Sequence, residues 1–457
     1  MGIALCTKFE PVPHKKRGMM ATSAESPLHN QLMEDLYHRF RPMPGHDPLE
    51  RGRGSIPLEL FYDLIYVIAF GFAAEELAHY VAEGSGWSAV GAYIFAIWAV
   101  SWAWLNSNWF ASAYSNDDAL FRVATFVQMI GVLILTFGLP VSFSAAADGQ
   151  SPNNMLMVIG YVIMRVPLMA LWLRAARQDP ARQQTAIAYS VAIGVAQVGW
   201  LLTAIVPLPA GTTITALIIL AAAEMVAPVL IERKFGLAPW NAGHIAERFG
   251  LLTIITLGEV VAATTMAVAA LTQVQGWTLS AVVIASSGII LASALWWAYF
   301  LIPSRTILEE WPERTFAWRY AHLLLFGTIS AVGAGLHVAA LAVEDGHLTL
   351  LLVAVALVVP VAAVILMIFV TWSVLLRSFD LTHLPLLIVT LIPLAAAIIV
   401  GAVAGSEAHI NPDNPSDVLA LVTVIGLVAL SCVIEVVGHE MVGSKHTIRA
   451  VKAKAAA

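Results

Sequence analysis

"TLLLVAVALVVPVAAVILMIFVTWSVLL", residues 349–376, contains no Asp, Glu, Lys or Arg, and this stretch decides the fold. A helix that crosses the hydrocarbon core of a bilayer needs roughly 20 consecutive apolar residues. The composition of the whole 457-residue chain agrees, because 59% of its residues are hydrophobic and only 12% are charged, against roughly 25% charged in soluble domains. We therefore expect a protein embedded in a membrane.

Apolar stretches of spanning length recur along the whole chain, separated by charges and by Pro or Gly. They predict an all-α integral membrane fold with about twelve transmembrane helices. The predicted spans lie near residues 57–81, 88–111, 120–145, 154–174, 185–206, 212–231, 246–272, 277–302, 317–342, 349–376, 384–404 and 417–438.

These spans predict one continuous helical transmembrane domain over residues 56–440. Residues 1–55 are rich in Pro, His, Lys and Arg and have little apolar periodicity, so we expect a disordered N-terminal tail. Residues 441–457 form a basic C-terminal tail.

Positive charge indicates the orientation, because cytoplasmic loops of membrane proteins carry an excess of Lys and Arg. If the N-terminus is inside, all but one of the 24 Lys and Arg residues fall in the two tails or at the inner loops and helix ends. The exception is Arg165, within the fourth span. The pattern predicts that both termini are cytoplasmic.

A weak internal symmetry relates the two halves of the chain. The segment "WAWLNSNW" (102–109) in the second span can be set against "WWAYF" (296–300) in the eighth. If the repeat is real, residues 56–235 and 243–440 are parallel six-helix halves related by an axis along the membrane normal. The spacing between matched positions drifts, so an undivided bundle stays the alternative.

Several classes of function are excluded by what the sequence lacks. Apart from Lys15, Lys16 and Arg17, which are more simply explained as cytoplasmic charge, no basic block suggests nucleic-acid binding. Cys6 and Cys432 lie too far apart in the chain to suggest a metal cluster or a disulfide. Phosphate-binding loops, nucleophile elbows and HExxH helices are missing. No cofactor is identified.

Ionisable residues inside the spans are the candidates for a site. Each costs roughly 2.5–3.5 kcal/mol at the centre of a membrane helix, and such groups usually face a partner or a cavity. Each either forms a structural ion pair or lines an ion or substrate pathway. The candidates are Glu59, Asp63, Arg165, Glu224, Glu259 and Glu435.

Arg165 should face the protein interior within reach of a carboxylate, because a guanidinium cannot lose its proton to escape burial. Glu259 matches its depth best and ranks first as the partner, Asp63 ranks second, and Glu224 is the third candidate. Gly333 and Gly335 are places where a helix can bend.

Other polar residues near the spans have structural explanations. Asp117 is placed to cap the third span, and Asp118 to pair with Arg122 four residues on. His322 and His337 are fifteen residues apart on one span, which is not a metal-ligand spacing, so each is expected to be simply hydrogen-bonded. Most of the fourteen tryptophans fall near predicted membrane interfaces and are attributed to aromatic belts there.

Four segments carry a resemblance to a known family: "LELFYDLIYVIAF" (58–70), "SNDDALFRVATFVQMIGVL" (115–133), "GYVIMRVPLMALWLRAAR" (160–177) and "ERFGLLTIITLGE" (247–259). In these segments the chain resembles the bacterial low temperature requirement protein A family. The resemblance implies a multi-pass protein of the bacterial cytoplasmic (inner) membrane. Asp63, Arg165 and Glu259 fall in its motifs, whereas Val260 stands where the family often has a small hydroxyl residue.

The leading hypothesis is a secondary transporter or ion-translocating protein, in which buried carboxylates bind protons or cations and Arg165 supplies a counter-charge. The alternatives are an intramembrane enzyme or a cofactor- or lipid-binding protein, and a sensory protein for growth in the cold. A polar cavity between the halves that is open to one side favours transport, and a side portal facing lipid tails with clustered acid and base favours the enzyme. The expected partners are the lipid bilayer, an unidentified small molecule or ion, and another copy of the chain in a homo-oligomer.

Overall fold

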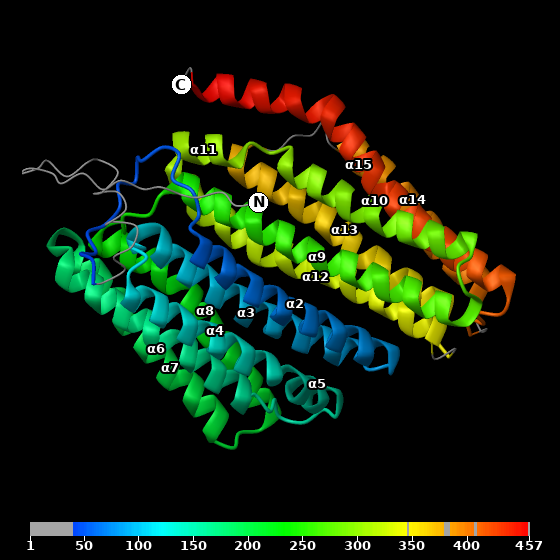
Figure 1. The fold of residues 1–457 in the computed structure, drawn as a ribbon, viewed down its shortest axis with the longest axis horizontal. Coiled ribbons are helices and arrows are strands. Elements are labelled where there is room, and N and C mark those ends of the chain that lie inside the picture. Colours follow the sequence, from blue (N-terminus) through cyan, green and yellow to red (C-terminus); the bar gives the residue numbers. More distant parts are fainter. Residues whose placement is uncertain (1–39, 345–346, 379–383, 406–408, 456–457) are drawn as a thin grey trace, which may run out of the picture.

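The computed structural model describes residues 40–344, 347–378, 384–405 and 409–455. In this part of the chain twelve helical segments are long and apolar enough to cross a membrane, as predicted. Their helices, drawn in Figure 1, are α2 (Pro57–Ala82), α3 (Gly86–Tyr114), α4 (Ala119–Phe137) with α5 (Leu139–Ala147), α6 (Met155–Gln178), α7 (Gln183–Ile205), α8 (Ala210–Phe235), α9 (Ala242–Gln275), α10 (Leu279–Phe300) with α11 (Ser304–Glu310), α12 (Thr315–Glu344), α13 (Leu350–Leu376), α14 (Leu384–Gly405) and α15 (Pro415–Ala455).

The third predicted span is broken in two. Helix α4 ends at Phe137, and α5 begins at Leu139 with Pro140 in its first turn. Proline lacks the amide hydrogen that would continue the helical ladder, and its ring restricts the residue before it. Gly138 joins the two pieces, so the chain crosses the membrane region as two helices in succession.

Helix α12 is the centre of the bundle and α8 lies at its edge. In the membrane-length window of α12, 83% of the residues are buried, against 17% for α8. Figure 1 shows α2, α9, α12 and α13 side by side, with the helices from α3 to α8 on one side and α14 and α15 on the other. The two predicted halves therefore meet where α2 packs against α9 and α12; their relation by a repeat stays a prediction.

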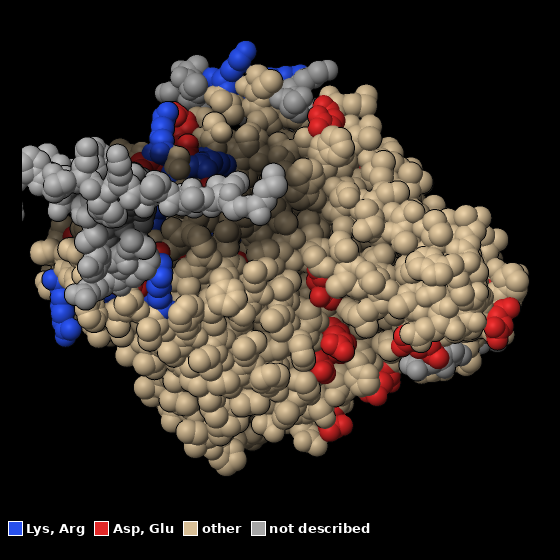
Figure 2. Space-filling model, in the orientation of Figure 1, with Lys and Arg blue, Asp and Glu red and all other residues tan. Residues whose placement is uncertain are grey.

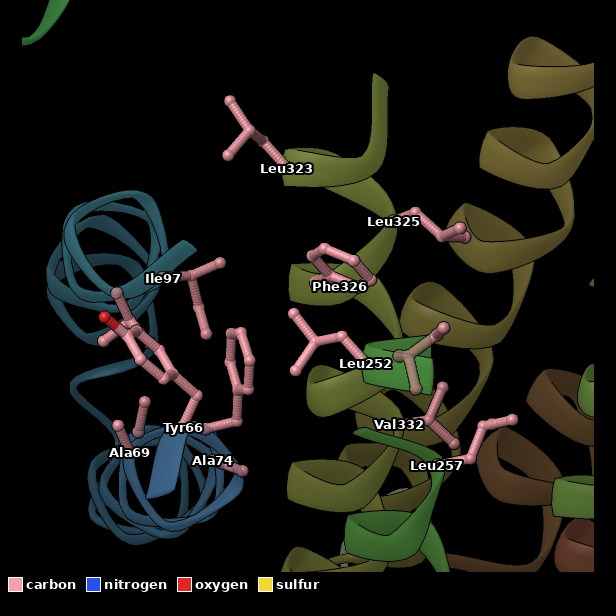
Figure 3. Close-up of a cluster of buried hydrophobic side chains, with 14 of the residues drawn as sticks. Tyr66, Ala69, Ala74, Ile97, Leu252, Leu257, Leu323, Leu325, Phe326 and Val332 are labelled. Atoms are coloured by element: carbon pink, nitrogen blue, oxygen red, sulfur yellow. The ribbon is translucent and has the colours of Figure 1, made fainter. Parts of the chain in front are cut away.

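Small residues allow the helices to approach closely. Gly131 of α4 and Gly160 of α6 face each other, and a methyl group on either would collide with the backbone of the other helix. Such contacts drive helix association in a bilayer, where the lipid tails are as apolar as the side chains. In the central core, Figure 3 shows Tyr66, Ala69 and Ala74 of α2 and Ile97 of α3 facing side chains of α9 and α12.

The two ends of the bundle carry opposite charge. We call one end the basic end; it carries Arg53, Arg122, Arg174, Arg305 and Arg377. We call the opposite end the acidic end; its exposed acids include Glu83, Asp148, Glu344 and Asp413. On the face shown in Figure 2, Lys and Arg occur at one end only, and the other end shows acidic side chains alone. This is the segregation that the sequence predicted; the assignment of the basic end to the cytoplasm stays a prediction.

The segment from residue 40 to residue 55 packs on the basic end of α3. Met43 is fully buried, and the Arg53 guanidinium donates to the carbonyl oxygens of Ser112 at 2.5 Å and Ala111 at 3.1 Å. A cation at a helix C-terminus is stabilised by the free carbonyls and the helix dipole. The prediction of a disordered tail thus differs from the structure over residues 40–55, and residues 1–39 lie outside the described part. At the other terminus, α15 continues through the predicted basic tail to Ala455.

Candidate functional site

All six candidate residues lie in described helices, and they form four separate groups. Glu59 and Asp63 lie together on α2, and Arg165 of α6 meets Glu224 of α8. Glu259 on α9 and Glu435 on α15 each pair with a histidine instead. The sequence therefore identified buried charges but did not identify a single shared site.

Arg165 and Glu224 form a buried ion pair, with Nη2 of Arg165 3.0 Å from Oε2 of Glu224. The expectation that Arg165 faces the interior near one of three acids is confirmed, but the ranking was wrong, because Glu224 rather than Glu259 or Asp63 is the partner. Tyr161, one turn from Arg165 on α6, donates to the same Glu224 oxygen at 2.7 Å. Depth along the membrane normal cannot show which helices are neighbours; α7 packs against both α6 and α8, and this brings Glu224 within reach of Arg165.

Glu224 is held by two indoles as well. Trp102 of α3 donates to Oε2 and Trp200 of α7 to Oε1, each at 2.7 Å. In contrast, Nε and Nη1 of Arg165 have no hydrogen-bond partner among the described residues. One oxygen of the Glu224 carboxylate, Oε2, thus accepts several hydrogen bonds, while the Arg165 guanidinium retains free donors.

The cation of the Glu59 and Asp63 group comes from α9. Arg248 donates two hydrogen bonds to Asp63, from Nε at 3.0 Å and from Nη2 at 2.5 Å. His244, one turn earlier on α9, lies 3.1 Å from Glu59. Glu59 also accepts the backbone N–H of Ile56 at 3.1 Å, so it stabilises the start of α2 as a first-turn acid commonly does. The sequence placed Arg248 among the cytoplasmic charges, yet it is only 1% exposed.

Glu259 pairs with His337 of α12, with Oε1 2.8 Å from Nε2. Two glycines make room for it: a Cβ atom on Gly71 of α2 or on Gly333 of α12 would lie 2.7 Å from the Glu259 side chain. Gly333 therefore permits close approach, whereas the sequence suggested a bend; α12 is one continuous helix. His337 is hydrogen-bonded, as expected.

Glu435 forms a second pair of this kind. One of its oxygens is 2.7 Å from Nε2 of His439, one turn later on α15, and the other accepts a hydrogen bond from Thr390 of α14 at 2.8 Å. The group lies at the edge of the bundle formed by α14 and α15 (Figure 1).

Sequence reasoning missed the role of the tryptophans in α3. Trp102 donates to Glu224, Trp104 to Asp63 at 2.6 Å, and Trp109 to Glu232 at 2.9 Å. A buried indole N–H needs an acceptor, so three tryptophans inside one span were a signal for buried carboxylates. The aromatic-belt explanation is therefore wrong for these three residues.

Glu232 and Arg319 were also missed, because both lie near predicted helix ends. Glu232 accepts hydrogen bonds from Trp109, Tyr189 and Trp240. The Arg319 guanidinium lies 3.5 Å from the centre of the Trp109 ring, which makes a cation–π contact.

At the basic end the predicted roles of two neighbouring aspartates are exchanged. Asp118 caps α4 by accepting from the N–H of Phe121 at 2.9 Å, and Asp117 forms the ion pair with Arg122 at 2.8 Å. Burial raises the pKa of the Asp118 carboxyl, but its hydrogen bonds with the Arg174 guanidinium and backbone N–H groups outweigh burial and hold that pKa below its ordinary value.

The largest cavity described, of about 320 Å³, lies between α7 and α8. It is lined by Glu224 together with Asn106 and Tyr189, and otherwise mainly by aliphatic side chains. Among the described residues no group of three or more His, Cys, Asp or Glu side chains is placed to hold a metal ion.

Comparison with known proteins identifies the family. Residues 55–425 match the model of the family described as bacterial low temperature requirement A protein (LtrA). The chain belongs to this family. It is also similar to a protein of Rhizobium meliloti (strain 1021) that is named as uncharacterized, with 23% identity over 334 residues, which cover 70% of this chain and 76% of that protein. A search of solved structures gives no match.

The range of the LtrA match separates the candidate groups. Residues 55–425 include the groups at Asp63, Arg165 and Glu259, whereas Glu435 and His439 lie beyond the matched range. This protein is therefore a multi-pass bacterial membrane protein of the LtrA family whose matched region contains three of the four buried groups.

Proposed function

We propose that the protein is a secondary transporter or ion-translocating protein that moves protons, alone or coupled to a small solute. The observation that supports this proposal is the buried pair of Glu259 and His337, 2.8 Å apart and about one-tenth exposed each. Ionisable residues within membrane helices are rare, almost always face the bundle interior or a water-filled cavity, and mark ion and proton pathways.

Chemistry distinguishes this pair from the arginine pairs. An arginine keeps its charge, so the pairs of Arg165 with Glu224 and of Arg248 with Asp63 each contain a permanent cation. Histidine changes its charge near neutral pH, and a carboxylate beside it can accept a proton. The Glu259 pair can therefore gain and lose a proton without leaving an unbalanced permanent cation in the membrane.

An apolar layer separates this pair from the basic end. Helices α2, α9 and α12 all run from the basic to the acidic end. Along them come first the Asp63 and Arg248 group, then Phe70, Leu252 and Phe326, and then the Glu259 pair. These three apolar side chains are at most 1% exposed, and Figure 3 shows Leu252 and Phe326 packed in the central cluster. We infer that this layer closes the pathway and opens during transport.

A flux measurement tests the proposal. Purified protein is reconstituted into liposomes that contain a pH-sensitive dye, and a potassium diffusion potential drives protons inward. We expect faster internal acidification than in empty liposomes, and a return to the empty rate for Glu259→Gln and for His337→Asn. Gln keeps the size of Glu and one acceptor oxygen but cannot carry the charge.

The matched control is Glu75→Gln, which removes an exposed carboxylate at the acidic end of α2. It should leave the flux unchanged. Full flux in Glu259→Gln would contradict the proposal. Acidification at the empty-liposome rate in wild-type vesicles of either orientation would contradict proton movement without a solute. Gel filtration of each variant shows whether a loss of flux reflects a loss of folded protein.

A further inference from the structure

The cavity between α7 and α8 opens through the side of the bundle. Val195 on its α7 wall is 68% exposed, and Ala223 on its α8 wall is also exposed. On a membrane-embedded bundle these surfaces face lipid. A molecule can therefore enter this cavity directly from the bilayer.

The two helices are joined at both ends of the cavity, so neither end is the entrance. Toward the acidic end, Gly199 of α7 is so close to Leu220 of α8 that a Cβ atom would lie 2.5 Å from the leucine side chain. At the basic end, the Thr185 hydroxyl is 3.1 Å from the carbonyl oxygen of Phe235 and 3.0 Å from that of Gly236. The opening lies between these two contacts.

The size of the cavity suits one small ligand. Its volume of about 320 Å³ lies at the lower end of the roughly 300–1,000 Å³ found for ligand pockets. It is about twice the roughly 150 Å³ of an engineered apolar cavity that binds benzene. The aliphatic lining, with Ala192, Ala196, Leu220 and Ala227, favours a hydrocarbon body.

Most of the free polar positions on the wall are acceptors. Oε1 of Glu224 accepts one described hydrogen bond, from Trp200, whereas Oε2 accepts three. Asn106 uses one of its two amide N–H groups to bond the carbonyl of Trp102, and none of the described hydrogen bonds uses the other N–H or the side-chain oxygen. The Tyr189 hydroxyl already donates to Glu232. A ligand head must therefore bring a hydrogen-bond donor.

Charge narrows the choice of donor. Arg165 neutralises Glu224, so an ammonium head would add an unbalanced cation beside a buried guanidinium. A carboxylate head would face the like charge of Glu224 and would find only the second amide N–H of Asn106 as a donor on the wall. A neutral hydroxyl meets both conditions, because it donates one hydrogen bond and carries no charge.

We propose that this cavity is a binding site for a neutral amphiphile with a hydroxyl head and an aliphatic body, taken up from the bilayer. The hydroxyl donates to Oε1 of Glu224 or to Asn106, and the chain fills the space between α7 and α8. The site is separate from the Glu259 pair. An experiment that finds no amphiphile bound in this cavity therefore leaves the proposed proton flux through the Glu259 pair untouched, and the reverse also holds.

Photolabelling of the full chain in lipid nanodiscs tests the proposal. The probe is a long-chain alcohol with a photoreactive diazirine in its chain, and two comparison probes carry the same chain with a carboxylic acid or a quaternary ammonium head. We expect the alcohol to label peptides of α7 and α8 most strongly and to be displaced by unlabelled dodecanol. Ala223→Phe, which fills the cavity, should reduce this labelling by roughly tenfold, equivalent to about 1.4 kcal/mol.

Ala222→Phe is the matched control, because Ala222 is also exposed on α8 but does not line the cavity. It should leave labelling at the wild-type level. If Ala223→Phe does not fold, Ala192→Leu fills the same space from the α7 wall. A further comparison probe is the methyl ether of the alcohol, which cannot donate a hydrogen bond. Asn106→Leu should reduce the preference of the cavity for the alcohol over this ether.

Three outcomes would overturn the proposal. The first is equal labelling of α7 and α8 by alcohol, acid and ammonium probes. The second is labelling that Ala222→Phe reduces as much as Ala223→Phe. The third is labelling confined to other helices.

Discussion

A double-mutant cycle on Arg165 and Glu224 tests the central structural claim about the buried charges. The perturbations are Arg165→Leu, Glu224→Leu and the double variant. Each single substitution leaves a charge without its counter-ion inside the bundle, whereas the double substitution removes both charges. The structure therefore predicts that the double variant is more stable than the sum of the single effects implies.

The magnitude follows from the contacts of Glu224, whose carboxylate accepts hydrogen bonds from Trp102, Tyr161, Arg165 and Trp200. Breaking a buried ion pair by removing one partner costs about 3–5 kcal/mol. Three further donors lose their acceptor, at about 0.6 kcal/mol each in membrane proteins. Glu224→Leu should lower the free energy of unfolding by about 5–7 kcal/mol, and Arg165→Leu by about 3–5 kcal/mol, because three donors still hold the carboxylate.

The double variant should lose only about 2 kcal/mol of unfolding free energy, because the indoles of Trp102 and Trp200 and the hydroxyl of Tyr161 lose their acceptor. The assay is unfolding in mixed micelles, followed by tryptophan fluorescence, with unfolding rates compared where refolding is incomplete. Arg165→Leu with Glu259→Leu is the matched control, because these residues share no partner in the structure and their effects should add within about 0.5 kcal/mol. Additive effects for Arg165 and Glu224, or rescue by Glu259→Leu, would refute the pairing.

Four other predictions concern the ends of the bundle. A cysteine placed at residue 148 should react with an impermeant reagent outside intact cells, and one near residue 180 should be protected; the reverse would place the basic end outside. Deletion of residues 1–39 should leave the yield of folded protein unchanged, whereas Arg53→Ala, which removes charged hydrogen bonds to the end of α3, should cost about 1.5 kcal/mol, visible as a lower melting temperature. Burial and, after it, the Arg53 charge lower the pKa of His46 from 6.5. His46 therefore contributes stability above pH 6.5 that is lost as the pH falls through the lowered pKa. Melting temperatures measured over a series of pH values should show this loss in the wild-type protein, and His46→Gln should remove it.

The twelve spans could be predicted because a bilayer leaves the chain few choices. Without water in the membrane, each crossing segment must satisfy its own backbone, so length and composition are enough to locate it. The break between α4 and α5 follows from local chemistry at Gly138 and Pro140. The exchange of Asp117 and Asp118 shows the limit of such rules, since two adjacent acids can each satisfy the helix end or the arginine.

The partners of the buried charges could not be predicted. Position in a span gives the depth of Glu259 and Arg165, but contact also requires that two helices be neighbours and that the side chains face each other. Arg248 was placed among the cytoplasmic charges because it lies only seven residues into α9, whereas the packing of α2 against α9 buries it beside Asp63. Helix order in the bundle is a tertiary property that hydropathy does not contain.

The tryptophans of α3 divide the buried carboxylates into two kinds. Asp63, Glu224 and Glu232 each accept an indole N–H from α3, and each lies near an arginine that keeps its charge. A rigid aromatic donor and a permanent cation together stabilise the ionised form and hold it in one place.

Glu259 has neither kind of partner among its described contacts. Its hydrogen bond is with His337, and the glycines at positions 71 and 333 leave the carboxylate close to two helix backbones. A structural carboxylate gains from fixed charges and fixed donors, whereas histidine, whose own charge can change, is a partner with which a carboxylate can exchange a proton. Within the region that matches the family, Glu259 is thus the candidate acid deepest in the bundle whose pairing permits that exchange, and this is why the flux test is centred on it.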